Sequence, residues 1–290
     1  MNLIDRIVSY VSPEAGLKRA RARAATGILN AYEGASISRR TEGWRTVGSD
    51  ANAETRASLS VLRNRSRDLV RNNPYASKAV AVIANNVVGT GILPQAKART
   101  KARTRVIEDL AKAHLDTTAI DARGTLDFYG IQGQVIRTVV ESGECLIRRR
   151  HRRPADGLPL PFQIQVLEPD FLDTSKDGPL PNNGGVVKQG VQFDPIGRRT
   201  GYWLFSQHPG DAYSFRQLKS TFVPAADIIH VYRPDRPGQV RGVPWGSPVI
   251  IKLRDFDEYD DYQLLRQKIA ACYTVFVYDD ELGVGQATPS

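Results

Sequence analysis

The order of apolar and polar residues divides the chain into a helical N-terminal half and a β-rich region that leads into a long helix. Residues 52–88 follow the helical period, with one interruption at Asn73 and Pro74. Asn is a good helix cap and Pro fits the first helical turn, so two helices are expected to meet there. The second is mostly apolar and rich in Ala, which predicts burial, and Gly89 provides its C-terminal stop.

Two more helices are predicted before the β-rich region. Residues 101–116 form an amphipathic pattern. Residues 125–142 form the next, with Thr125 as the N-cap and Gly143 as the stop.

After Gly143 the pattern changes to short β-type runs separated by Pro and Gly. Residues 191–205 are expected to form a hairpin with its turn from Asp194 to Arg198. Helices and strands are segregated, which predicts an α+β fold and not a βαβ repeat. The expected strands are 144–150, 162–168, 186–193, 201–206, 221–224 and 227–232.

The two ends of the chain have their own patterns. A long helix is predicted from about Pro248 to Ala271, roughly 36 Å at about 1.5 Å per residue, which is typical of a pillar. At the other end, residues 2–11 carry a short amphipathic stripe that stops at Pro13. A basic run and a Gly/Ser/Thr-rich linker follow, so residues 1–48 are expected to form an extended arm.

Composition limits the classes of protein to which the chain can belong. The 290 residues include 40 Lys plus Arg and 31 Asp plus Glu, giving a formal charge of +9. That excess suits a polyanionic partner such as nucleic acid, although solubility explains it equally well unless the charges cluster. Cys145 and Cys272 lie in apolar runs and are expected to be reduced and buried. No apolar run approaches the roughly 20 residues of a membrane helix, and no signal peptide is apparent.

Catalytic motifs are absent from the sequence. The four histidines have no metal-ligand spacing, and neither a Walker phosphate loop nor a nucleophile elbow occurs. We therefore predict no catalytic residue, cofactor site or metal site. One alternative class stays open, a metal-dependent nucleic-acid enzyme that uses the acidic cluster Asp255, Asp257, Glu258, Asp260 and Asp261. A solvated acidic helix face is the simpler interpretation of that cluster.

Two basic runs could contact DNA or a protein partner. Such runs bind phosphate backbones through counterion release, but they also occur as solvated surface, and both interpretations stay open. The first run contains Lys18, Arg19, Arg21 and Arg23, and the second contains Arg148, Arg149, Arg150, Arg152 and Arg153.

Five stretches, taken in order over roughly residues 50 to 280, resemble the lambda-type portal proteins of tailed phages. They are RDLVRNNPYASKAVAVIANNVVGTGI, ESGECLIRR, QVLEPDFLDT, GVQFDPIGRRTGYWLF followed by HPGD, and the run from PAADIIHVY through the long helix to TVFV. None is a low-complexity string, and their common order is specific.

This resemblance implies a structural role and no enzyme activity. The expected assembly is a dodecameric ring at one vertex of the virion capsid, formed in the host cytoplasm. Its expected partners are further copies of the chain, the double-stranded DNA that passes through it, the terminase large subunit, and capsid and head-tail joining proteins. No membrane or cofactor is implied.

By the same analogy, the chain divides into an N-terminal basic arm and linker (1–48), a helical wing-like region (49–124), a stem-like helix with a β-rich clip-like region (125–247), and a long stem-like helix with the start of a channel loop (248–290). Residues 125–142 and 248–271 are expected to be paired stem helices. Asp257, Glu258, Asp260 and Asp261 would then line the channel, because a carboxylate lining lets DNA slide whereas a basic lining grips it. Related proteins continue further, so the chain is expected to be a fragment or a truncated product.

Overall fold

A computed structural model describes residues 10–29, 39–181, 184–211 and 219–273, in two compact units, Met1–Ser49 and Asp50–Ser290. In the first unit, α2 spans Pro13–Leu29 and carries the basic run from Lys18 to Arg23. The expectation of an extended arm is therefore wrong for this segment, because Pro13 occupies the first turn of a helix, where its missing N–H costs nothing. The amphipathic stripe of residues 2–11 lies almost wholly outside the described residues.

The second unit begins with two helices that meet at Asn73, as predicted. α3 spans Ala51–Asn72 and α4 spans Pro74–Val88. The Asn73 side chain is buried and accepts a hydrogen bond from the Ala76 N–H at 2.9 Å. The predicted cap and first-turn pair is therefore confirmed.

Two further helices, α5 (Lys101–Leu115) and α6 (Phe128–Ser142), precede the strands. Helix α6 begins three residues later than expected, with Asp127 as its cap instead of Thr125. The reason is local: Thr125 donates both its N–H and its hydroxyl to the buried Asp121 carboxylate, which holds residues 121–126 in a turn. Gly143 ends the helix in the left-handed conformation, as predicted.

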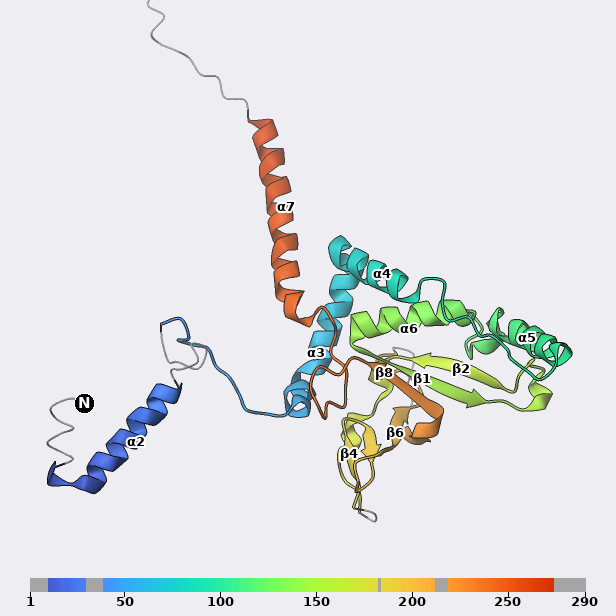
Figure 1. The fold of residues 1–290 in the computed structure, drawn as a ribbon. Coiled ribbons are helices and arrows are strands. Elements are labelled where there is room, and N and C mark those ends of the chain that lie inside the picture. The colour runs from blue at the N-terminus through green and yellow to red at the C-terminus, as the bar shows by residue number, and fades with distance from the viewer. Residues whose placement is uncertain (1–9, 30–38, 182–183, 212–218, 274–290) are drawn as a thin grey trace, which may run out of the picture. The chain divides into compact units, whose positions relative to one another are not determined.

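The strands form two antiparallel sheets (Figure 1). The three-stranded sheet has the order β2 (Phe162–Leu167), β1 (Glu144–His151), β8 (Ile228–Tyr232). The five-stranded sheet has the order β3 (Gly178–Pro179), β4 (Val186–Lys188), β5 (Val191–Phe193), β6 (Arg199–Phe205), β7 (Ser220–Pro224). The α+β class is confirmed.

One turn between these strands agrees with the sequence prediction, and another does not. The hairpin of β5 and β6 turns at Asp194–Arg198, as expected, and its Asp194 carboxylate accepts a hydrogen bond from the Arg198 N–H. Residues 186–193, expected as one strand, are two strands joined at Gln189 and Gly190, both with positive φ. A tight turn of this kind reverses the chain within two residues, so the apolar pattern continues across it.

The core lies on both faces of the three-stranded sheet. Side chains of β1 alternate, so Cys145 and Ile147 face α6, whereas Leu146 faces the five-stranded sheet. One cluster therefore joins α6 to the sheet, and the other joins the two sheets. This layering brings the start of β1, the end of α6 and β8 close together.

Helix α7 (Ile250–Cys272) contacts the rest of its unit mainly near its N-terminal end. Phe256 packs edge-on against Tyr75, and the Asn73 amide donates a hydrogen bond to Asp257. Cys145 is buried as expected, but Cys272 is exposed, because it is the last residue of this helix and lies outside the core. No described helix is long and apolar enough to span a membrane.

Helices α6 and α7 differ in the elements that they contact most. α6 packs on α4, α3 and β1, whereas α7 packs on α3. The expectation that residues 125–142 and 248–271 pair as stem helices stays a prediction, because the main contacts of α6 and α7 are with different elements of the described residues. Burial differs between the two helices, because the apolar side chains of α6 cover the sheet whereas most apolar side chains of α7 are exposed.

Candidate functional site

A buried carboxylate, Glu144 at the start of β1, organises the most polar region of the interior. One of its oxygens accepts from Arg63 of α3 at 3.1 Å and from the Arg241 Nε at 2.7 Å. The other accepts from His230 of β8 at 2.9 Å and from the Gly242 N–H at 2.9 Å. Four donors from three separate parts of the chain therefore converge on one side chain with no solvent exposure.

The charges around Glu144 hold it ionised. Burial by itself raises the pKa of this carboxyl, but the charge of Arg241 and the hydrogen bond from His230 outweigh burial and hold its pKa well below the ordinary range. Glu144 cannot reach solvent or a substrate, so it cannot act as a general base. Its role is to hold α3, β1, β8 and the loop at residue 242 together.

His230 is neutral in this arrangement. Its Nδ1 lies 3.1 Å from a guanidinium nitrogen of Arg199, which can only donate, so Nδ1 must accept and Nε2 must carry the proton that is donated to Glu144. Burial lowers the pKa of this imidazole, in agreement with that proton assignment.

A second layer of ion pairs extends the network to the surface. Arg63 also binds Asp170 at 3.1 Å, and Arg67 binds the other oxygen of Asp170 at 2.6 Å. Arg67 further contacts Glu168 at 2.8 Å and the Ser142 hydroxyl at 3.0 Å. Two arginines one helical turn apart on α3 thus fasten that helix to the segment after β2.

Close backbone contact fixes the loop that leads from this network into α7. A Cβ atom on Gly143 would collide with the carbonyl carbon of Val243, and one on Gly242 would collide with the Gly143 oxygen. The Trp245 N–H also donates to the Val140 oxygen of α6 at 3.1 Å. The base of α7 is therefore held by the end of α6 and by Glu144.

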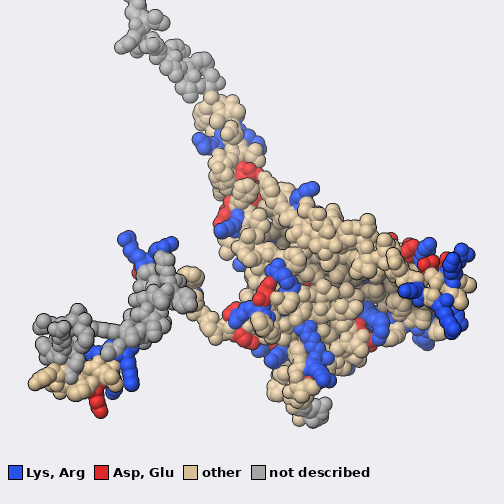
Figure 2. Space-filling view, in the orientation of Figure 1, with Lys and Arg blue, Asp and Glu red and all other residues tan. Residues whose placement is uncertain are grey.

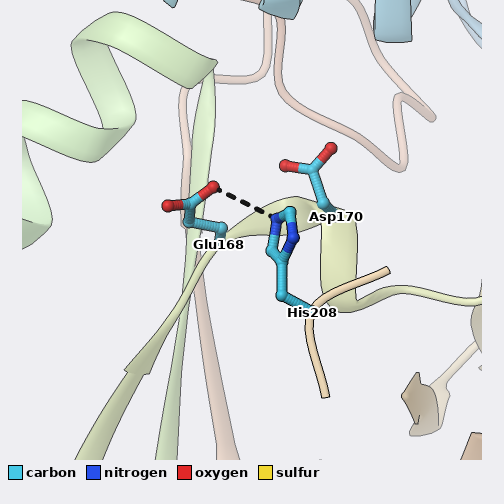
Figure 3. Close-up of side chains that lie close together, drawn as sticks. All are labelled: Glu168, Asp170 and His208. Atoms are coloured by element: carbon cyan, nitrogen blue, oxygen red, sulfur yellow. Dashed lines mark ion pairs between the residues drawn. The ribbon is translucent and has the colours of Figure 1, made fainter. Parts of the chain in front are cut away.

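One group in the described residues has metal-ligand geometry, namely Glu168, Asp170 and His208 (Figure 3). Their ligand atoms lie within 4.8 Å of one another. However, the positively charged Arg67 guanidinium already contacts both carboxylates. A metal cation would have to displace Arg67 before it could bind there. Glu168 is also 51% exposed, which favours an ion-pair surface over a metal site.

The acidic cluster on α7 does not form a metal site in the structure. Asp257 accepts from Asn73, and Glu258 pairs with Arg254 at 3.2 Å. Asp255, Asp260 and Asp261 are exposed. Among the described residues these carboxylates do not gather into a metal-binding group, so the nuclease alternative gains no support.

The predicted basic residues are divided between two units. Lys18, Arg19 and Arg21 are exposed on α2, and Arg23 lies on the same helix with a side chain outside the described residues. Arg148, Arg149 and Arg150 lie on β1, while Arg152 and Arg153 follow it. Figure 2 shows further Lys and Arg gathered over the end of the second unit that carries α5, a helix that exposes Lys101, Arg103 and Arg105.

The ion network around Glu144 was not predicted from the sequence. A signal was present, since Glu144 and His230 interrupt runs that otherwise read as apolar strands, ECLI and IIHVY. A charged residue in a buried strand requires a partner. The identity of that partner could not be read, because Arg63 and Arg241 lie 81 and 97 residues away from Glu144.

Comparison with known proteins gives one consistent result. The chain is 28% identical over 271 residues to the "Probable portal protein" of Halomonas phage phiHAP-1, covering 89% of this chain and 51% of that protein. It is 24% identical over 235 residues to "Portal protein B" of Escherichia phage lambda, covering 73% of this chain and 42% of that protein. It is 23% identical over 257 residues to the "Portal protein" of Escherichia phage N15, covering 81% of this chain and 46% of that protein.

The chain thus spans about half the length of the curated relatives it matches. The sequence profile described as "Phage portal protein, lambda family" matches residues 37–287, which include the ion network and the whole of α7. The chain belongs to the lambda family of phage portal proteins.

Proposed function

We propose that this protein is a structural subunit of a portal ring at one vertex of a phage capsid, where it serves as head-tail connector. The observation that carries the proposal is the family match over residues 37–287. The family is structural and does not consist of enzymes, in keeping with the lack of a phosphate loop in the sequence.

The state of α7 supports assembly with further copies. Leu264, Leu265 and Ile269 are each about half exposed, at 53%, 52% and 49%. A helix that presents apolar side chains to water gains stability when a neighbour covers them. In a ring, the adjacent subunits supply that cover, and each subunit uses two different surfaces.

The proposed partners follow from the portal role. Double-stranded DNA passes through the ring, the terminase large subunit docks on it, and capsid and head-tail joining proteins bind it at the vertex. The protein is then a virion component that assembles in the host cytoplasm.

The acidic residues of α7 suit a channel wall. Glu258, Asp260 and Asp261 are exposed in the single chain. DNA carries about one charge per 1.7 Å of axis, so a basic wall would bind it through counterion release and slow its movement, whereas a carboxylate wall would not. Asp257 is less suited to this role, because Asn73 binds it at the base of the helix.

In this proposal residues 49–124 form the wing, 125–247 contain the clip-like β structure, and 248–290 contain the stem helix and the start of a channel loop. The stem role rests on α7, since α6 is part of the layered core. Residues 1–48 precede these regions as a basic arm.

Electron microscopy of the purified protein tests the portal role. The expected result is a closed ring with an axial hole. Monomers, or compact particles without a hole at concentrations where related portals form rings, would contradict it. Divalent-dependent DNA cleavage that disappears in Asp257→Asn would instead establish the enzyme alternative.

A further inference from the structure

The basic run after Glu144 is divided by the strand on which it lies. Successive side chains of β1 point to opposite faces of the sheet, so Arg149 and His151 share one face and Arg148 and Arg150 share the other. Arg152 follows the second group, since its guanidinium binds Gln163, the cross-strand partner of Arg150. Five basic residues that are adjacent in the sequence therefore belong to two different surfaces.

The face that carries Arg149 and His151 is already neutralised. Both side chains contact the same oxygen of Asp227, each at 3.0 Å. Hydrogen bonds from His151 and then Arg149 hold the pKa of Asp227 below its ordinary value, so the carboxylate is ionised near neutral pH. The charge of Arg149 on this face is therefore compensated by Asp227, so the face offers no unpaired arginine to a bound anion.

The opposite face carries three arginines that lack a carboxylate partner within the described residues. Arg150 binds the Gln165 amide oxygen at 3.4 Å, and Arg152 binds that of Gln163 at 2.8 Å. Gln163 is itself fixed by hydrogen bonds from its amide to the Ala119 and Asp121 oxygens. Neutral amides thus orient the guanidinium groups of Arg150 and Arg152, and the charge of these two groups stays available.

Like charges accumulate on this face. Arg148 and Arg150 are two residues apart on one strand, which places their Cα atoms about 6.6 Å apart. Burial and then the charge of Arg150 lower the pKa of Arg148. All three arginines are half-buried, so their side chains are held in place while no described carboxylate pairs with them directly. A bound anion would relieve their repulsion.

We propose that the face of Arg148, Arg150 and Arg152 binds the phosphate backbone of duplex nucleic acid without reading its sequence. The proposal deepens the portal function and rests on it for the identity of the polymer. Arginines that share one face, with the Cα atoms of Arg148 and Arg150 about 6.6 Å apart, suit a polymer with regularly repeated phosphates.

Binding of the purified protein to a short duplex DNA of mixed sequence, measured over a range of salt concentrations, tests this inference. In the variant Arg150→Gln with Arg152→Gln, the slope of log K against log salt should become less negative by about 1.8, since each phosphate that is no longer neutralised accounts for about 0.9. Replacing the same two residues by Lys should keep the slope, because the charges remain.

A matched control removes two positive charges elsewhere. Arg149→Gln with Arg254→Gln has the same net charge, but both arginines are paired with carboxylates. Its slope should equal that of the parent protein. If both glutamine variants weaken the salt dependence equally, net charge and not this face governs binding, and the inference is wrong.

Ring formation separates this inference from the proposed function. Glutamine variants that assemble normally, melt at the parental temperature and bind DNA more weakly support the inference. Variants that bind DNA like the parent but fail to form rings would show that the face contacts a protein, which overturns it. If the parent protein forms no rings, but its DNA affinity falls in the Arg150→Gln, Arg152→Gln variant and not in the control variant, the result contradicts the portal role and supports the proposed DNA-binding face.

Discussion

Among single residues, Glu144 joins the largest number of separate elements through one buried side chain. It is fully buried and accepts hydrogen bonds from residues of α3 and β8 and from the loop before α7. A buried carboxylate adds little net stability over an apolar residue of the same shape, but its removal leaves the partner charges buried without compensation. Arg63 and Arg241 are those partners.

We expect Glu144→Ala to lower the free energy of unfolding by about 3–5 kcal/mol. Urea denaturation followed by circular dichroism measures this change. Glu108→Ala, an exposed position on α5, is the control and should change stability by no more than about 0.5 kcal/mol. Equal effects at the two positions would show that the network contributes nothing specific.

The protonation state of His230 predicts a pH dependence. Burial holds its pKa in the folded state below the ordinary 6.5, so the unfolded chain binds this proton more readily than the folded chain. The stability contributed by the neutral ring is present above about pH 6.5 and is lost as the pH falls toward the folded-state pKa. Glu144, whose pKa is also lowered, adds a further loss below its ordinary 4.5.

The measurement is the urea midpoint at several values between about pH 7 and pH 5, where we expect a steady decrease. His230→Gln should reduce the slope, because Gln offers a donor to Glu144 and an acceptor to Arg199 but does not titrate. Some slope will remain, since burial also lowers the pKa of His114. An unchanged slope in His230→Gln would show that the pKa of this imidazole is the same in the folded and the unfolded chain.

Among the elements of the second unit, Asn73 couples α4 to α7. Its carbonyl oxygen caps α4 and its amide donates to Asp257 at the base of α7. These two functions use different atoms of the same side chain, so they can be separated by substitution.

Asn73→Ala should cost about 0.5–2 kcal/mol through loss of the cap. Asn73→Asp keeps an oxygen for the Ala76 N–H but places a carboxylate beside Asp257, so we expect α7 alone to loosen. Amide hydrogen exchange distinguishes the two, with faster exchange in α4 and α7 for Ala and mainly in α7 for Asp. Identical exchange patterns would show that Asn73 does not hold α7.

Gly133 inside α6 and Gly143 at its C-cap provide a test of the described end of this helix. Gly143 has φ 91° and no room for a Cβ atom, whereas Gly133 has nothing within 4 Å of its Cβ position. Gly143→Ala should destabilise the protein by at least about 1–3 kcal/mol through backbone strain and collision. Gly133→Ala should stabilise it by about 0.5–1 kcal/mol, because it lies in a helix interior. Thermal melting of both variants measures the opposite signs, and a shared sign would contradict the described helix end.

At the scale of the whole assembly, the proposed role of α7 makes a further prediction. Asp260→Lys with Asp261→Lys should leave ring formation intact, because both residues are exposed and the apolar positions of α7 are unchanged. If they line the channel, each added cation should steepen the salt dependence of DNA binding by about 0.9. Packaging should then slow. Rings that form normally and package DNA at the parental rate at every salt concentration would show that α7 does not line the channel.

The local structure of this chain is predictable from the order of its residues. The cap at Asn73, the stop at Gly143 and the turn at Asp194–Arg198 were all readable, because each depends on neighbours within a few residues. The ordered stretches of resemblance also indicated the family. The helix start at Asp127 was missed because Asp121 competes for Thr125.

Which charges act together depends on long-range contacts that form when the chain folds. Glu144 is joined to residues 81 and 97 positions away, and such pairings leave no periodic trace in the chain. The same is true of Arg149 and Arg150, which are neighbours in sequence but point to opposite faces of β1, one toward Asp227 and the other toward Gln165. A charge pattern gives the number and sign of the charges, whereas burial and strand pairing determine which of them remain free to bind a partner.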